Sequence, residues 1–141
     1  DTLFVLAGSI PAGVPKDVYR KITERVHEKG AKVLLDADGE LFSESLKASP
    51  DMLKPNRLEL ERHFKMDYRA SEKELAGLGQ RLMEGGVSMA AISLGQMGAL
   101  LLPWHMDGTG SFRWRNVSGS VWEYQQGQSP PLAPSRRQGN W

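Results

Sequence analysis

The chain of 141 residues contains no cysteine and no long apolar run. The absence of cysteine excludes disulfides, thiolate catalysis and cysteine-based zinc sites. No apolar segment approaches the roughly 20 residues that span a bilayer, and residues 1–6 lack the cationic region of a signal peptide. We therefore expect a soluble, cytoplasmic protein with no membrane partner.

A strong excess of charge is also missing, because 18 lysines and arginines face 17 aspartates and glutamates. The small net charge gives no general attraction to nucleic acid or to anionic lipid. An anionic ligand would have to be bound by local groups.

The composition changes near residue 108. Residues 108–141 contain four arginines, no lysine, one glutamate and three of the four tryptophans, with no recognisable period after about Val121. We predict a folded part over residues 1–107 and a divergent, poorly ordered tail over 108–141. Trp114, Trp122 and Tyr124 could stack on single-stranded nucleic acid, but tail residues outside the fold are the simpler explanation, and no nucleic-acid partner is expected.

Hydrophobic spacing in the folded part predicts alternating strands and helices. Short apolar runs predict strands at residues 3–7, 32–36, 52–53, 87–94 and 99–102. Helical spacing predicts helices from about 15 to 29, 40 to 47, 56 to 64 and 72 to 83. This order predicts an α/β fold of three layers: a mostly parallel sheet with helices on both faces, and an antiparallel extension that turns at Asp107 and Gly108.

Polar residues follow the predicted parallel strands where each strand ends. Ser9 follows the first strand, Asp36 ends the second, Asn56 follows the third and Ser93 closes the fourth. The carboxyl ends of parallel strands lie at one edge of the sheet, where loops and helix N-termini offer backbone amides to ligands. We therefore expect one cleft to contain all four.

Four segments resemble motifs of the ribokinase-like PfkB carbohydrate kinases. They are closest to the hexose-phosphate kinases, the group that includes 1-phosphofructokinase and tagatose-6-phosphate kinase. The segments are G-S-I-P-A-G-V-P (8–15), L-D-A-D-G-E (35–40), K-P-N-R-L-E-L (54–60) and S-L-G-Q-M-G-A (93–99). They occur in the family's order and spacing, and Asp38 stands where the family usually has serine.

The resemblance implies ATP-dependent phosphorylation of a phosphorylated ketohexose of the fructose-1-phosphate, fructose-6-phosphate or tagatose-6-phosphate class. It implies that Ser9 contacts the sugar phosphate. It also implies that Asn56 and Glu59 act through water and Mg²⁺ on the ATP phosphates, and that Ser93, Gly95 and Gly98 line the nucleotide side. Oxygen ligands suit a mostly hydrated Mg²⁺. ATP and Mg²⁺ are thus the expected cofactors, and the full-length parent could form a homodimer.

One family motif has no counterpart in the chain. The family's G-A-G-D box supplies the catalytic base and the anion hole, and the nearest segment here, N-V-S-G-S (116–120), has one glycine and no acid. We therefore expect no catalytic residue in this chain. Family-like sequence ends near Phe112, and we interpret the chain as a truncated, inactive fragment that begins in mid-domain. The alternative is a non-catalytic nucleotide-binding or interaction module.

The same residues also have structural explanations. Asn56 and Glu59 have the spacing of a helix capping pair, Ser9 could be a turn residue, and Gly95 and Gly98 could be hairpin glycines. Asp36 is expected to accept hydrogen bonds from loop amides. The three histidines have no metal-ligand spacing, and we expect them to be solvated: His27, His63 and His105.

Overall fold

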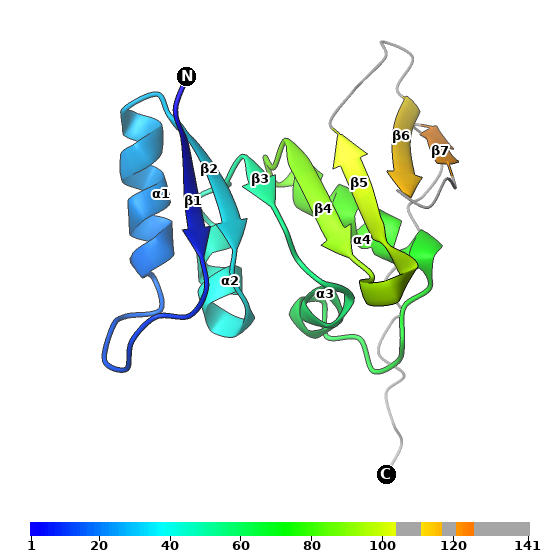
Figure 1. Cartoon of the computed structure of the whole chain (residues 1–141), viewed down its shortest axis with the longest axis horizontal. Helices are drawn as coiled ribbons and strands as arrows, with labels where there is room; N and C mark the ends of the chain where they lie inside the picture. The colour runs from blue at the N-terminus through cyan, green and yellow to red at the C-terminus, as the bar shows by residue number, and fades with distance from the viewer. Residues whose placement is uncertain (104–110, 117–120, 126–141) are drawn as a thin grey trace.

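The computed structural model describes residues 1–103, 111–116 and 121–125 (Figure 1). The strands are β1 (Leu3–Ala7), β2 (Lys32–Asp36), β3 (Met52–Leu53), β4 (Met89–Ser93), β5 (Ala99–Pro103), β6 (Ser111–Asn116) and β7 (Val121–Gln125). The helices are α1 (Val18–Glu28), α2 (Gly39–Leu46), α3 (Arg57–His63), α4 (Glu72–Glu84) and the 3-10 turn η1 (Gly95–Met97). The elements predicted up to residue 102 are confirmed.

The described strands form one sheet in the order β1-β2-β3-β4-β5-β6-β7. Strands β1 to β4 are parallel, whereas β5, β6 and β7 are added antiparallel at one edge. The predicted antiparallel extension is therefore confirmed, although the turn expected at Asp107 and Gly108 lies outside the described residues.

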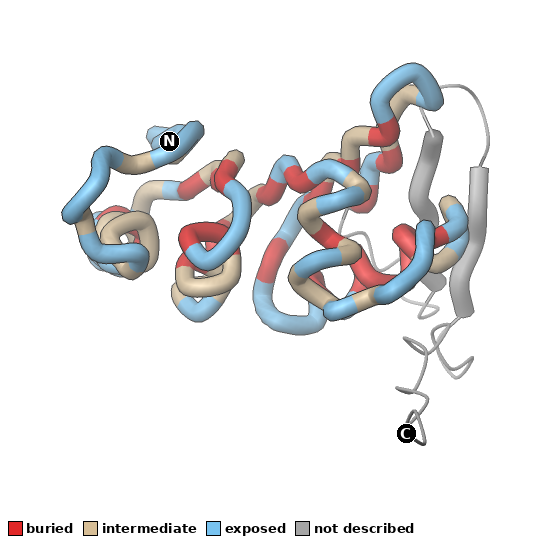
Figure 2. The backbone as a smooth tube through the Cα atoms, turned by 90° about the horizontal axis from the view of Figure 1, so that it is seen from below, coloured by how far each residue is buried: buried red, intermediate tan, exposed pale blue. Residues whose placement is uncertain are grey.

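The described helices lie in one layer, on one face of the sheet (Figures 1 and 2). Helices α1 and α2 contact β2, and α4 contacts β4 and β5. Each parallel strand lies beside the previous one in the same direction, and right-handed crossovers then put every connecting helix on the same face. The second helical layer expected from the sequence is not formed by any residue that the structure describes.

A row of apolar side chains across the sheet forms the centre of the core. Paired positions of β1 to β5 place five residues in register beneath the helices: Leu6, Leu35, Leu53, Ala90 and Leu102. All but Leu6 are buried, and they pack with Phe42, Leu60 and Leu75 from the helices. Each fully buried large apolar side chain contributes about 1.5–3 kcal/mol to stability.

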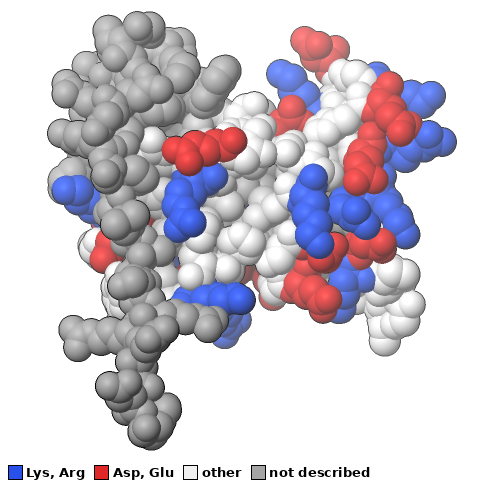
Figure 3. Space-filling view, turned by 180° about the vertical axis from the view of Figure 1, so that it is seen from behind, with Lys and Arg blue, Asp and Glu red and all other residues white. Residues whose placement is uncertain are grey.

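The outer face of the helix layer is charged. Figure 3 shows lysine and arginine side chains next to aspartate and glutamate on this side. At the start of α1, the N-cap residue Asp17 pairs with Lys21 at 3.0 Å and with Arg20 at 3.4 Å. Such exposed pairs contribute little to stability, so the buried row beneath the helices carries most of the energy that holds this layer. No described helix is long and apolar enough to cross a bilayer.

Strands β6 and β7 lie within the segment predicted as a tail. β7 has the sequence V-W-E-Y-Q, which is rich in the β-branched and aromatic residues that favour strands. The prediction that no strand period follows about Val121 is therefore wrong. Poor order of the other tail residues stays a prediction, because they lie outside the described part.

Candidate functional site

The carboxyl ends of the parallel strands are tied together by backbone hydrogen bonds. The Gly8 N–H donates to the carbonyl of Asp36 at 3.0 Å, and the Ser93 N–H donates to the carbonyl of Pro55 at 2.9 Å. Asn56 forms a parallel bridge with Ser93. The structure thus places the four predicted polar clusters at one edge of the sheet, while their roles in binding stay predictions.

The loop after β1 is held by Gly8 and Tyr19. Gly8 has a φ of 85°, a left-handed conformation that side chains with a Cβ rarely adopt. The Tyr19 hydroxyl donates to the carbonyl of Ala7 at 2.9 Å and so ties α1 to the end of β1. Ser9 is exposed immediately after this point, which leaves its hydroxyl open to solvent at the edge. No local pattern in the sequence indicated this contribution of Tyr19, because Ala7 lies twelve residues away.

Asn56 and Glu59 form the N-terminal capping box of α3. The Asn56 Oδ1 accepts from the Glu59 N–H at 2.8 Å, and the Glu59 Oε2 accepts from the Asn56 N–H at 2.8 Å. The structural explanation of this pair is confirmed. It does not exclude ligand binding, because the cap leaves the Glu59 Oε1 without a hydrogen bond to any described residue.

Three carboxylates gather around this cap. Burial raises the pKa of Glu59, and the neighbouring charges of Asp38 and Asp36 raise it further, while the Asn56 N–H and Lys54 oppose the shift. The Lys54 Nζ lies 2.8 Å from Asp36 Oδ2. The Asp36 carboxylate therefore pairs with a lysine, and it is the Asp36 backbone carbonyl that accepts from a loop amide.

This arrangement fits a hydrated Mg²⁺ better than a dehydrated ion. No group of three or more histidine, aspartate or glutamate side chains among the described residues is arranged to hold a metal directly. Mg²⁺ usually keeps several waters and is bound through one or two carboxylates together with substrate phosphates. Glu59, with one uncapped oxygen beside two further carboxylates, can hold such an ion through water.

The connection from β4 to β5 carries Ser93, Gly95 and Gly98. The Leu94 N–H donates to the carbonyl of Gly98 at 2.8 Å and closes a tight turn around η1. Gly95 and Gly98 have φ values of 62° and 88°, and a Cβ on Gly95 would meet open space. The turn itself therefore requires these glycines through their φ angles, and the hairpin explanation holds whether or not a nucleotide also lies against them.

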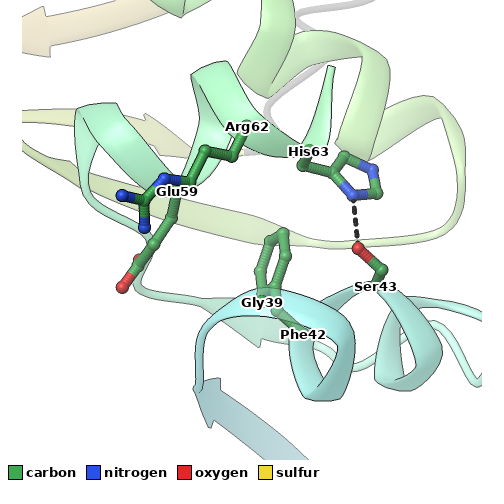
Figure 4. A pocket seen from close by; sticks show the side chains of 6 residues that line it. All are labelled: Gly39, Phe42, Ser43, Glu59, Arg62 and His63. Carbon is green, nitrogen blue, oxygen red and sulfur yellow. Dashed lines mark hydrogen bonds between the residues drawn. The ribbon is translucent and has the colours of Figure 1, made fainter. Parts of the chain in front are cut away.

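A small hollow between α2 and α3 contains a serine and histidine pair (Figure 4). It has a volume of about 100 Å³ and is lined by Gly39, Phe42, Ser43, Glu59, Arg62 and His63. The Ser43 Oγ and His63 Nδ1 lie 2.9 Å apart. The expectation that His63 is solvated is wrong, because the side chain packs edge-on against Phe42 and Phe64.

His27 is not simply solvated either. Its Nε2 lies 2.9 Å from the Oδ2 of Asp51, which also accepts from the Val33 N–H at 2.8 Å. Burial raises the pKa of Asp51, but the hydrogen bonds from Val33 and His27 outweigh it, so the pKa is lowered overall. This pair joins α1 to the residue before β3, and the Val33 N–H ties the same carboxylate to β2. His105 lies outside the described residues.

The burial of His63 predicts a pH-dependent stability. Burial lowers the pKa of His63 below its usual value of 6.5, so the unfolded chain takes up a proton on this residue more readily than the folded chain. We expect the contribution of His63 to the free energy of unfolding to be complete above about pH 6.5. This contribution should be lost as the pH falls through the pKa of His63 in the folded protein. Urea unfolding of the native protein and of His63→Gln between pH 5 and 7.5 measures it. Parallel pH profiles would contradict the prediction.

Comparison with known proteins places the chain among carbohydrate kinases. Residues 1–117 match the pfkB family carbohydrate kinase, ten residues beyond the predicted boundary at 107. The chain is 37% identical over 99 residues to the 1-phosphofructokinase of Bacillus subtilis, covering 70% of this chain and 32% of that protein. It is 35% identical over 97 residues to the D-tagatose-1-phosphate kinase of Bacillus licheniformis, covering 69% of this chain and 32% of that protein.

The structural comparison agrees on the fold. The phosphofructokinase-2 of Escherichia coli, solved in complex with fructose-6-phosphate, superposes with a TM-score of 0.70 at 22% identity, covering 82% of this chain and 36% of that one. The ribokinase-like α/β architecture predicted from the sequence is thereby confirmed. The chain spans about a third of the length of the curated relatives it matches. On the match over residues 1–117, it belongs to the pfkB family of carbohydrate kinases.

Proposed function

We propose that this chain forms the ATP-binding wall, and one sugar-phosphate contact, of a kinase that phosphorylates a phosphorylated ketohexose. The observation that carries the proposal is the convergence of Ser9, Asn56 with Glu59, and Ser93 at the carboxyl edge of parallel strands tied in register. Ligands of open α/β sheets bind at this edge. The names of the relatives, a 1-phosphofructokinase and a D-tagatose-1-phosphate kinase, support a ketohexose phosphate as the acceptor.

Each polar group at the edge has a defined task in this proposal. Ser9, on the exposed loop after β1, donates to the phosphate or a hydroxyl of the sugar. Asn56 and Glu59 would hold Mg²⁺ through water, and the ion would supply positive charge beside the ATP phosphates. Ser93 and the two glycines of the following turn lie against the nucleotide, where the absence of side chains allows close approach.

By itself the chain is proposed to bind nucleotide without turnover. No segment of the sequence matches the G-A-G-D box. Phosphoryl transfer depends on positioning and electrostatic stabilisation, so a site without base and anion hole loses most of its rate. A coupled assay with fructose-1-phosphate, fructose-6-phosphate and tagatose-6-phosphate is expected to show no turnover, and clear turnover by this chain alone would refute this part. A cytoplasmic location, and a homodimer of the full-length kinase, belong to the same proposal.

Substitution of the capping residue Asn56 distinguishes a role in ligand binding from a role in helix capping alone. We expect Asn56→Ala to lower the free energy of unfolding by ~1 kcal/mol, and to weaken binding of Mg²⁺-ATP on the order of tenfold through loss of a hydrogen bond to a charged network. Displacement of a fluorescent ATP analogue measures the affinity. Urea unfolding measures the stability of the same preparations.

Helix α4 offers a matched control with the same chemistry. Ser71 and Glu74 form a second capping box, in which the Ser71 Oγ accepts from the Glu74 N–H at 3.1 Å. Ser71→Ala should cost a similar stability and leave the affinity for the analogue unchanged. If both variants alter affinity equally, or if Asn56→Ala alters stability alone, the role assigned to Asn56 is wrong.

The second candidate function is a non-catalytic nucleotide-binding or interaction module. The missing G-A-G-D box favours it, because the remaining edge groups can hold phosphates without activating an acceptor hydroxyl. The affinity measurement distinguishes the forms of this candidate. A nucleotide-binding module retains Mg²⁺-dependent affinity, whereas a pure interaction module shows none.

A further inference from the structure

Helices α2 and α3 meet at two levels that lie one helical turn apart. Gly39 and Ser43 are four residues apart on α2, and Glu59 and His63 are four residues apart on α3. Residues with this spacing share one face of a helix, and all four line the hollow between the two helices. Figure 4 shows Glu59 at one end of this hollow and the bonded Ser43 and His63 at the other. We call the two ends the edge level and the inner level.

The edge level contains no bond that sets the distance between the helices. Gly39 has no side chain, and a Cβ at this position would meet nothing within 4 Å. The Glu59 Oε2 accepts from the N–H of Asn56, within its own helix cap. Among the described residues, the side-chain hydrogen bond that joins α2 to α3 is the one between Ser43 and His63. The spacing of the two helix N-termini therefore depends on the inner level.

The inner level is tightly held. The Ser43 Oγ lies 2.9 Å from the His63 Nδ1, and the imidazole packs edge-on against Phe42, with ring centroids 5.5 Å apart. Phe42 is 1% exposed, so the ring that orients the imidazole is itself fixed in the core. On the other side, the imidazole meets Phe64 edge-on, and the guanidinium of Arg81 from α4 lies over that ring at 5.0 Å. Contacts to three helices thus hold the imidazole in place beside Ser43.

We propose that Ser43 and His63 are positioning residues for the magnesium side of the nucleotide edge, an inference that rests on the function proposed above. Their hydrogen bond fixes the spacing of α2 and α3 one turn from the edge. It thereby also fixes how far Asp38, the N-cap residue of α2, lies from Glu59 in the first turn of α3. Carboxylates that share a hydrated Mg²⁺ must keep a set distance, because Mg²⁺ requires near-ideal octahedral geometry.

Electrostatics support the view that Asp38 and Glu59 act on the same space. Burial, and then the charge of Asp38, raise the pKa of Glu59. The two carboxylates are thus close enough to repel each other, and this repulsion pushes the N-termini of α2 and α3 apart. A bond at the inner level opposes that separation when no cation is bound. The pair therefore holds the edge ready for a cation before the nucleotide arrives.

Removal of the Ser43 hydroxyl tests this role in the full 141-residue chain. We expect Ser43→Ala to weaken binding of the fluorescent ATP analogue in the presence of Mg²⁺ by about threefold to tenfold, the equivalent of one hydrogen bond. The affinity in excess EDTA should stay unchanged, because the pair acts on the carboxylates and not on the turn after β4. A general loss of stability would lower both affinities together.

Two further serine substitutions separate positioning from stability. Ser43→Thr keeps the hydroxyl and should retain the Mg²⁺-dependent affinity, although threonine is a poorer helix former than alanine. Ser45→Ala is the matched control on the same helix, because the buried Ser45 Oγ donates to the carbonyl of Leu41 at 2.5 Å, within α2. It should leave both affinities unchanged. Urea unfolding establishes that each variant is folded under the conditions of the binding measurement.

A double variant tests whether the two side chains act as a pair. His63→Phe keeps a ring for Phe42 and Phe64 to pack against but removes the nitrogen that meets Ser43. Combined with Ser43→Ala, it should bind the analogue in the presence of Mg²⁺ no more weakly than the weaker single variant, because both changes break the same bond. Additive losses would show that the two side chains act separately and would overturn the pair.

The other outcomes also decide the question. Equal losses with and without Mg²⁺, or an effect of Ser45→Ala as large as that of Ser43→Ala, would make the role of the pair purely structural. If the native chain binds Mg²⁺-ATP and Ser43→Ala binds it equally well, this inference fails and the proposed function stands. If the native chain shows no Mg²⁺-dependent binding, the proposed function fails and the inference fails with it.

Discussion

Replacement of Phe42 by alanine is expected to lower the free energy of unfolding by about 3–5 kcal/mol. Phe42 is 1% exposed and belongs to the main core cluster. Its ring also meets His63 edge-on, with centroids 5.5 Å apart. The truncation removes this contact and leaves a cavity between α2 and α3, the two helices whose N-termini carry Asp38 and Glu59.

Urea unfolding monitored by circular dichroism measures this effect. Leu58→Ala is the control, because Leu58 is half exposed on α3 and a surface substitution of this kind usually changes stability by less than about 0.5 kcal/mol. A loss below about 1 kcal/mol for Phe42→Ala would mean that the two helices do not pack through this ring.

We expect Gly79→Val to destabilise the protein by about 1–3 kcal/mol through overpacking. Gly79 lies in the middle of α4, where an added Cβ would come 2.2 Å from Leu102 Cδ1 and 3.0 Å from Ile92 Cδ1. The helix approaches β4 and β5 closely because the glycine has no side chain. The better helix propensity of valine relative to glycine offsets only a few tenths of a kcal/mol.

A double variant tests the cause of this loss. Leu102→Ala alone should destabilise by about 2–5 kcal/mol, because it leaves a cavity. Combined with Gly79→Val, the two losses should be less than additive, because the new methyl groups occupy the space left by Leu102. Thermal and urea unfolding of the four proteins gives the coupling energy. Strict additivity would show that the clash lies elsewhere.

The predicted order of elements was confirmed up to β5 because each element has a strong local signal. Continuous apolar runs mark β1, β2 and β4, a helical period marks α4, and a capping pair marks the start of α3. The strand β7 was not predicted, although its V-W-E-Y-Q sequence has high strand propensity, because the composition and charge of residues 108–141 differ from those of the folded part.

The environment of the histidines could not be predicted from their spacing. His63 is half-buried because α2 and α3 pack side by side and bring Ser43 and Phe42 to it from twenty residues away. His27 meets Asp51 across a similar separation. In both pairs the two residues are too far apart in the sequence for a helical or strand period to predict their contact. The same limit applies to the Asp36 and Lys54 pair.

Local sequence by itself determined the strands, the helices and the four polar clusters, since backbone propensity, apolar period and strand ends are properties of neighbouring residues. It also determined that these clusters share one edge, because consecutive parallel strands must end on the same side. Only the tertiary structure decided that the described helices occupy one face and that Val5 and Met89 stay exposed. Both depend on crossover direction and on which distant segments pack together, and these are settled by burial summed over the whole fold.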